Sequence, residues 1–83
     1  MPGDSMKLLV DHLRVGTRYR VTYQITGVQR KPRMFVGDWM GVNDTINQLE
    51  FSLRPEAGTT AVDPEWIIKI EAVDASTPVR LPE

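Results

Sequence analysis

Cysteine is absent from this sequence, which excludes disulfide bonds and cysteine-ligated zinc or iron–sulfur centres. The single histidine, His12, is too few for a histidine-rich metal site within one chain. We therefore expect neither a metal ion nor another cofactor.

Long apolar runs are also missing. No stretch approaches the roughly 20 apolar residues that a membrane-spanning helix needs. The start of the chain lacks a basic region followed by a long apolar stretch, which is the pattern of a secretion signal. These absences predict no membrane partner and a cytoplasmic location, and the small cysteine-free chain suits a bacterial or phage protein.

The residue patterns of catalytic sites do not occur either. Ser5, Ser52 and Ser76 have no neighbouring base in the sequence, so no nucleophilic triad is indicated. There is no phosphate-binding glycine loop, and His12 falls among apolar residues of a predicted helix. We expect no catalytic residues and no enzymatic activity.

What is present is the composition of one small folded domain. The 83 residues are 41% hydrophobic and 25% charged, with a net charge of −1, which is ordinary for a globular protein. We expect residues 1–4 to be a flexible N-terminus and residues 5–74 to form one domain. Residues 75–83 are polar and proline-rich, which is typical of a loose C-terminal tail.

Alternation of apolar and polar residues predicts five short strands. They cover residues 17–26, 34–43, 48–54, 59–62 and 66–73. A short helix is predicted to begin at Asp4 or Ser5 and to end before Gly16, and a 3₁₀ turn is predicted at residues 63–65. The residues expected to be buried together are Val21, Tyr23, Leu49, Phe51, Ile68 and Ile70.

Asp38 lies at a position of its predicted strand that would otherwise face an apolar core. A bulge or sharp bend at Gly37–Asp38 would redirect the side chains, as happens where small barrels turn corners. The fold class that follows is all-β: a small, strongly bent, five-stranded barrel with a short N-terminal helix and a 3₁₀ turn before the last strand.

The segments RYRVTYQI, GDWMG, LEFSL and DPEWIIKI give a pattern over residues 5–73 that resembles two superfamilies of small barrel, the Sm-like and the Src-homology type (SH3-like). Asn43-Asp44 lies where the Sm-like RNA-binding signature has its Asp and Asn. The Arg-Gly pair of that signature and the ALYDY-type motif of Src-homology domains are both absent. The resemblance therefore implies a fold, and the binding residues of neither family are carried over.

Charge is unevenly distributed along the chain. Residues 1–41 hold seven Lys and Arg against three Asp and Glu, whereas residues 42–83 hold three against eight. A basic strand-and-loop patch with a nearby aromatic side chain is typical of single-stranded RNA or DNA binding. The candidate nucleic-acid-binding residues are Arg18, Arg20, Arg30, Lys31, Arg33 and Trp39. Two alternatives stay open: Trp39 fills the core, and acidic residues such as Glu50 or Glu71 neutralise the patch.

A second class of function is protein interaction or assembly into a homo-oligomer. The last two predicted strands offer edges for pairing, and the candidate interface residues are Trp66, Ile67 and Lys69. The alternative is that Ile67 packs under the N-terminal helix. The sequence thus predicts a non-catalytic binding module whose partner is either nucleic acid or another protein chain.

Overall fold

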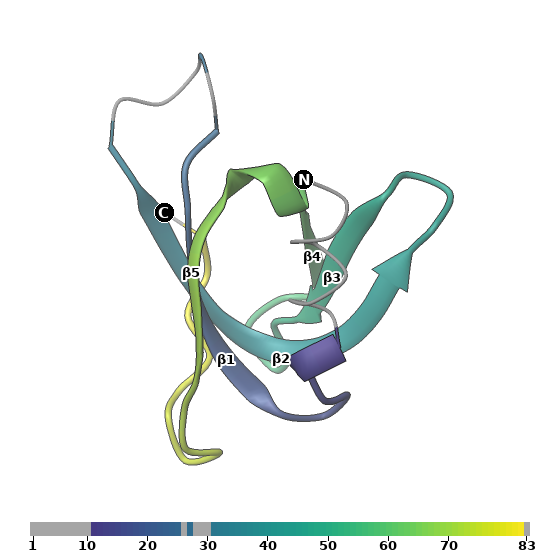
Figure 1. Ribbon diagram of the computed structural model, residues 1–83. Helices are drawn as coiled ribbons and strands as arrows, with labels where there is room; N and C mark the ends of the chain where they lie inside the picture. Colours follow the sequence, from purple (N-terminus) through teal and green to yellow (C-terminus); the bar gives the residue numbers. More distant parts are fainter. Residues whose placement is uncertain (1–10, 26, 28–30, 83) are drawn as a thin grey trace.

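Five antiparallel strands make up the computed structural model, which describes residues 11–25, 27 and 31–82 (Figure 1). The strands follow the order β4-β3-β2-β1-β5 in a single sheet. A 3₁₀ turn, η1, spans Pro64–Trp66 between the last two strands. The strand bounds are Arg18–Tyr23 for β1, Arg33–Asn43 for β2, Gln48–Ser52 for β3, Thr59–Val62 for β4 and Ile67–Ala72 for β5.

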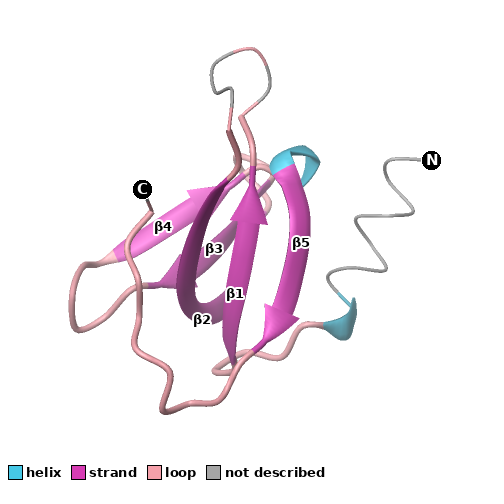
Figure 2. Ribbon diagram, turned by 90° about the vertical axis from the view of Figure 1, so that its left-hand side faces the viewer, coloured by secondary structure: helices cyan, strands magenta, loops and turns pink. Residues whose placement is uncertain are grey.

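The predicted five-stranded all-β domain, with a 3₁₀ turn before its last strand, is confirmed. The pairing differs from a closed barrel, because β4 and β5 lie at opposite ends of the sheet and do not pair with each other. Figure 2 shows the curved sheet with these two strands at its edges. Most of the predicted N-terminal helix lies outside the described residues. Of its described part, Asp11 and His12 are helical.

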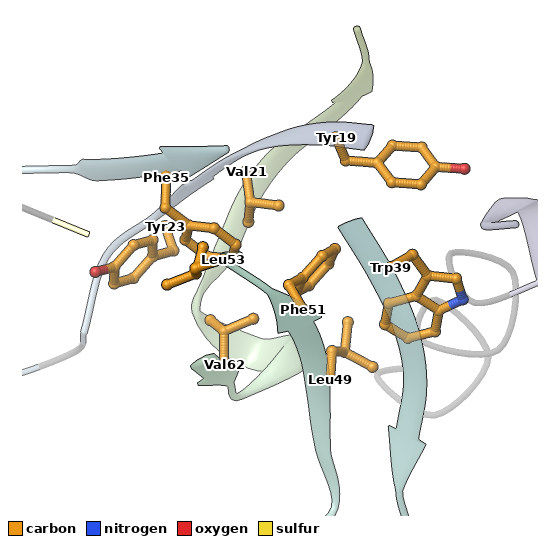
Figure 3. Packing of buried hydrophobic residues seen from close by; sticks show 9 residues of the cluster. All are labelled: Tyr19, Val21, Tyr23, Phe35, Trp39, Leu49, Phe51, Leu53 and Val62. Atoms are coloured by element: carbon orange, nitrogen blue, oxygen red, sulfur yellow. The ribbon is translucent and has the colours of Figure 1, made fainter. Parts of the chain in front are cut away.

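The core lies on the concave side of the sheet, where inward side chains from β1 to β4 meet (Figure 3). The alternation in β1 and β3 places Val21, Leu49 and Phe51 at 0% exposure. The rings of Phe35 and Trp39 both pack on Phe51, with centroids 5.2 Å away. The buried cluster comprises Tyr19, Val21, Tyr23, Phe35, Trp39, Leu49, Phe51, Leu53 and Val62.

Strand β2 bends in the region where its sequence has two glycines. A Cβ atom on Gly37 would lie 2.8 Å from the backbone oxygen of Ser52, so only glycine allows this approach of β2 to β3. The register then shifts between Trp39 and Gly41, and Gly41 adopts φ 133°. The predicted bulge at Gly37–Asp38 is therefore misplaced: Asp38 precedes the shift, and it lies on the outer face because it alternates with the inward Phe35 and Trp39.

The predicted phase of the last strand is wrong at Ile68. This side chain is 56% exposed, whereas Ile67 and Ile70 pack against the core. The pairing with β1 explains the difference, because Thr22 lies opposite Lys69 but Tyr23 lies opposite Ile67. Ile68 is therefore the extra residue of a bulge, and the inward positions are three residues apart instead of two.

The C-terminal segment differs from the loose tail that its composition predicts. Residues 74–82 leave β5 and rise beside β2 (Figure 2), where Val36 and Arg80 exchange two backbone hydrogen bonds of 3.0 Å. Asp74 starts the segment with a turn, and the hydrogen bond from the Ser76 N–H lowers the pKa of the Asp74 carboxyl. Val36 is on the outer face of the sheet, yet it is only 3% exposed.

Candidate functional site

Arg18 is the first residue of the predicted basic patch, and four of its five side-chain N–H donors bind groups within the protein. Nε and Nη2 donate to the two carboxylate oxygens of Asp38 at 2.9 and 3.2 Å. Nη1 donates to the backbone oxygens of Ala75 and Thr77 at 3.1 and 2.6 Å. The guanidinium therefore joins β1, β2 and the C-terminal segment, and these four bonds leave one of its five N–H donors, on Nη2, for any other partner.

Arg20 lies on the same outer face of β1 and is also paired. Its Nη1 is 3.1 Å from Oε1 of Glu71 on the neighbouring strand β5, and Lys69 Nζ lies 3.7 Å from the other oxygen of the same carboxylate. This is one of the two neutralising partners that the sequence left open. Glu71 reduces the positive potential of this part of the sheet.

Lys31 and Arg33 are the members of the patch that remain exposed in the described part of the chain. Neither side chain has an ion pair there. Arg30 lies outside the described residues. The five predicted cations are thus not all free, since Arg18 and Arg20 bind acidic groups of the protein itself.

Trp39 is a core residue and offers no surface for stacking on a base. The residue is 3% exposed, and its indole packs on Phe51. Its backbone is also engaged, because Trp39 N–H donates to Thr17 and Trp39 C=O accepts from Gly16, both at 3.0 Å. Contact between Trp39 and a nucleic-acid base would require an accessible indole ring, and this ring is buried in the core.

The three residues predicted for an oligomer interface have different environments. Trp66 and Ile67 are partly buried and pack against the core cluster. Lys69 is exposed, with 65% of its side chain accessible, and it faces Glu71. The exposed apolar residue of this strand is its neighbour Ile68, which the predicted phase had placed inside.

Strand β4 is the better-formed candidate surface, because no backbone group of the described residues pairs with its outer edge. Leu53 N–H donates to the oxygen of Gly58 at 2.8 Å, and the register continues with Phe51 opposite Thr60 and Leu49 opposite Val62. In an antiparallel pair, N–H and C=O groups alternate in direction along each strand. Thr60 and Val62 therefore bond to β3, while the N–H and C=O groups of Thr59 and Ala61 point away from the sheet.

The two edges of the sheet differ in their protection against further pairing. Strand β5 has a bulge at Ile68 and carries Lys69 and Glu71, and bulges and charges are devices that discourage edge association. Strand β4, with the sequence Thr-Thr-Ala-Val, has no charge, proline or register shift. The absence of charge and proline from this strand can be read from the sequence. The direction of its N–H groups can be known only from the register of its pairing with β3.

A surface pocket of about 380 Å³ lies between the outer face of the sheet and the C-terminal segment. Arg20, Met34 and Val36 line one wall, and residues 77–80 line the other.

Among the described residues, no three histidine or acidic side chains gather where they would hold a metal ion. No helix in that part of the chain is long and apolar enough to cross a membrane.

Comparison with known proteins adds no further assignment. No family model, curated protein or solved structure matches this chain.

Proposed function

We propose that the protein is a non-catalytic interaction module that binds another protein chain by accepting a strand at the outer edge of β4. The observation that carries this proposal is the unprotected edge itself: Thr59 and Ala61 direct their backbone donors and acceptors to solvent within an uncharged strand. An added strand satisfies those groups through main-chain hydrogen bonds, which is a common mode of peptide recognition.

The pairing of the outer-face arginines favours this function over nucleic-acid binding. The charge of Arg18 is already paired with Asp38, and that of Arg20 with Glu71. A cation that is paired within the protein adds less to phosphate binding than a free one. The β4 edge has no such competing partner among the described residues.

We also propose that the chain belongs to the small-barrel folds of the Sm-like or Src-homology type. Support comes from the antiparallel order of the five strands, the bend in β2 and the 3₁₀ turn directly before β5. Domains of this architecture serve many different binding functions, so the fold by itself does not identify the partner.

A displayed library of unstructured peptides tests the proposed function. Ala61→Pro removes the outward N–H, and its ring faces solvent at an edge strand, so pairing with β3 is retained. Ala61→Ser is the matched control because it keeps the N–H. Peptides selected on the parent should bind Ala61→Ser with similar affinity and lose at least about tenfold against Ala61→Pro, which corresponds to about 1.4 kcal/mol. Selected peptides that bind all three proteins equally would contradict the proposal.

A second candidate, binding of single-stranded RNA or DNA, retains support from the exposed side chains of Lys31 and Arg33. Fluorescence anisotropy with mixed-sequence oligonucleotides tests it. Binding through these residues should weaken with a log–log salt slope of about −0.7 per phosphate contacted. It should also fall in a Lys31→Glu, Arg33→Glu double variant and not in Arg54→Glu, another exposed cation. No binding at low salt would remove this candidate.

A further inference from the structure

We infer that the strand accepted at the β4 edge is β4 of a second copy of this chain, placed antiparallel about a two-fold axis through Thr60. This inference rests on the proposed function, because it names the partner for the same edge. The axis follows from the positions of the outward backbone groups, which belong to Thr59 and Ala61 and are therefore symmetric about Thr60.

The backbone pairing in this arrangement is complete. Thr59 of one copy faces Ala61 of the other, and the symmetry repeats the same pair in reverse. Each such pair exchanges two N–H···O=C bonds in an antiparallel ladder. All four outward N–H groups, those of Thr59 and Ala61 in each copy, thereby have a carbonyl acceptor on the other strand.

The side chains of β4 are compatible with a copy of themselves. Like charges placed directly opposite each other destabilise a strand pair, and β4 contains no charged residue. Thr60 would face Thr60 of the partner subunit across the axis, and β-branched residues pair well on a pleated surface. On the other face, Thr59 would face Ala61, whose small side chain leaves room for the threonine.

The length of β4 sets the strength of the association. A pairing along four residues buries much less surface than the roughly 800 Å² per partner that stable complexes bury. The dimer is therefore transient and forms as the concentration rises from micromolar toward millimolar values. Its short contact also keeps β4 accessible to other extended segments at low concentration.

Sedimentation velocity across this concentration range tests the inference on the full chain. The parent and Ala61→Ser should shift from the monomer mass toward twice that mass, whereas Ala61→Pro should remain monomeric. Circular dichroism and thermal melting establish that Ala61→Pro is folded. As a second disruptive variant, Ala61→Lys places a charge on the outer face of each partner strand and should also prevent the shift.

Two results would overturn the inference: a parent that stays monomeric throughout, or a dimer that Ala61→Pro and Ala61→Lys leave intact. The peptide-library experiment separates this failure from that of the proposed function. Peptides that bind the parent and not Ala61→Pro, together with a monomeric parent, would reject the second copy as partner and retain the β4 edge. Failure of both experiments would reject both.

Discussion

Arg18 shows at the scale of one residue how a predicted functional side chain becomes a structural one. Its hydrogen bond to Asp38, reinforced by the opposite charge, raises the pKa of the guanidinium above its ordinary value. An arginine side chain is charged at every pH used for a folded protein, with or without this shift. In the sequence, Asp38 is a charged residue among the apolar residues of its predicted strand. The side chain that binds it, Arg18, lies 20 residues earlier.

Replacing Arg18 by lysine tests this structural role. Lysine keeps the charge but cannot hold both oxygens of Asp38 and two backbone carbonyls in one plane. We expect the free energy of unfolding to fall by about 1–3 kcal/mol, as for loss of hydrogen bonds to charged groups. Urea denaturation measures the change, with Arg33→Lys at an exposed position as the control. Equal stability of the two variants would contradict the role.

Phe51 is the central residue of the core. It is 0% exposed, and its ring contacts both Phe35 and Trp39. Phe51→Ala should lower the free energy of unfolding by about 3–5 kcal/mol, which is comparable to the whole stability of a small domain. Thermal melting followed by circular dichroism should show a largely unfolded protein at room temperature. A melting temperature within a few degrees of the parent would mean that the strand phase described for β3 is wrong.

At the scale of the elements, the strands were largely predictable because alternation is a local signal. The period-two pattern of β1 and β3 is complete in the sequence, and both strands have the expected inward residues. The pattern of β5 is interrupted by a bulge, whose position depends on the partner strand β1. The three adjacent apolar residues from Trp66 to Ile68 could not by themselves indicate which of them faces outward.

Two glycines provide a matched test of the bend in β2. A Cβ atom on Gly37 would meet the Ser52 oxygen at 2.8 Å, whereas one on Gly58 would meet nothing within 4 Å. Gly37→Ala should therefore destabilise the protein by about 1–3 kcal/mol through overpacking. Gly58→Ala should be neutral or stabilising by up to about 1 kcal/mol. Chemical denaturation compares the two, and similar losses at both positions would argue against the close approach of β2 and β3.

The bulge in β5 predicts opposite responses from two neighbouring isoleucines. Ile67→Lys places a charge against the core and should cost at least about 2 kcal/mol. Ile68→Lys alters an exposed side chain and should change stability by no more than about 0.5 kcal/mol. Melting temperatures of the two variants decide the register. A more severe effect at Ile68 would restore the phase expected from simple alternation.

At the scale of the whole molecule, the unpredictable features are those that join distant parts of the sequence. Strand β1 from the basic half pairs with β5 from the acidic half, which brings Arg20 to Glu71. The uneven charge along the chain is thus partly cancelled in space. Arg18 and Val36 provide partners for the backbone of the C-terminal segment beside β2, and the composition of the segment gave no sign of them.

Of the two edges of the described sheet, that of β4 combines an open backbone with a lack of charge, and residue-resolved amide hydrogen exchange tests this most directly. At micromolar concentration the amides of Thr59 and Ala61 should exchange rapidly, whereas those of Thr60 and Val62, which bond to β3, should be protected. At millimolar concentration exchange at Thr59 and Ala61 should slow as copies pair. Equal protection of all four amides at the lowest concentration would show that the edge is not open and would contradict the account.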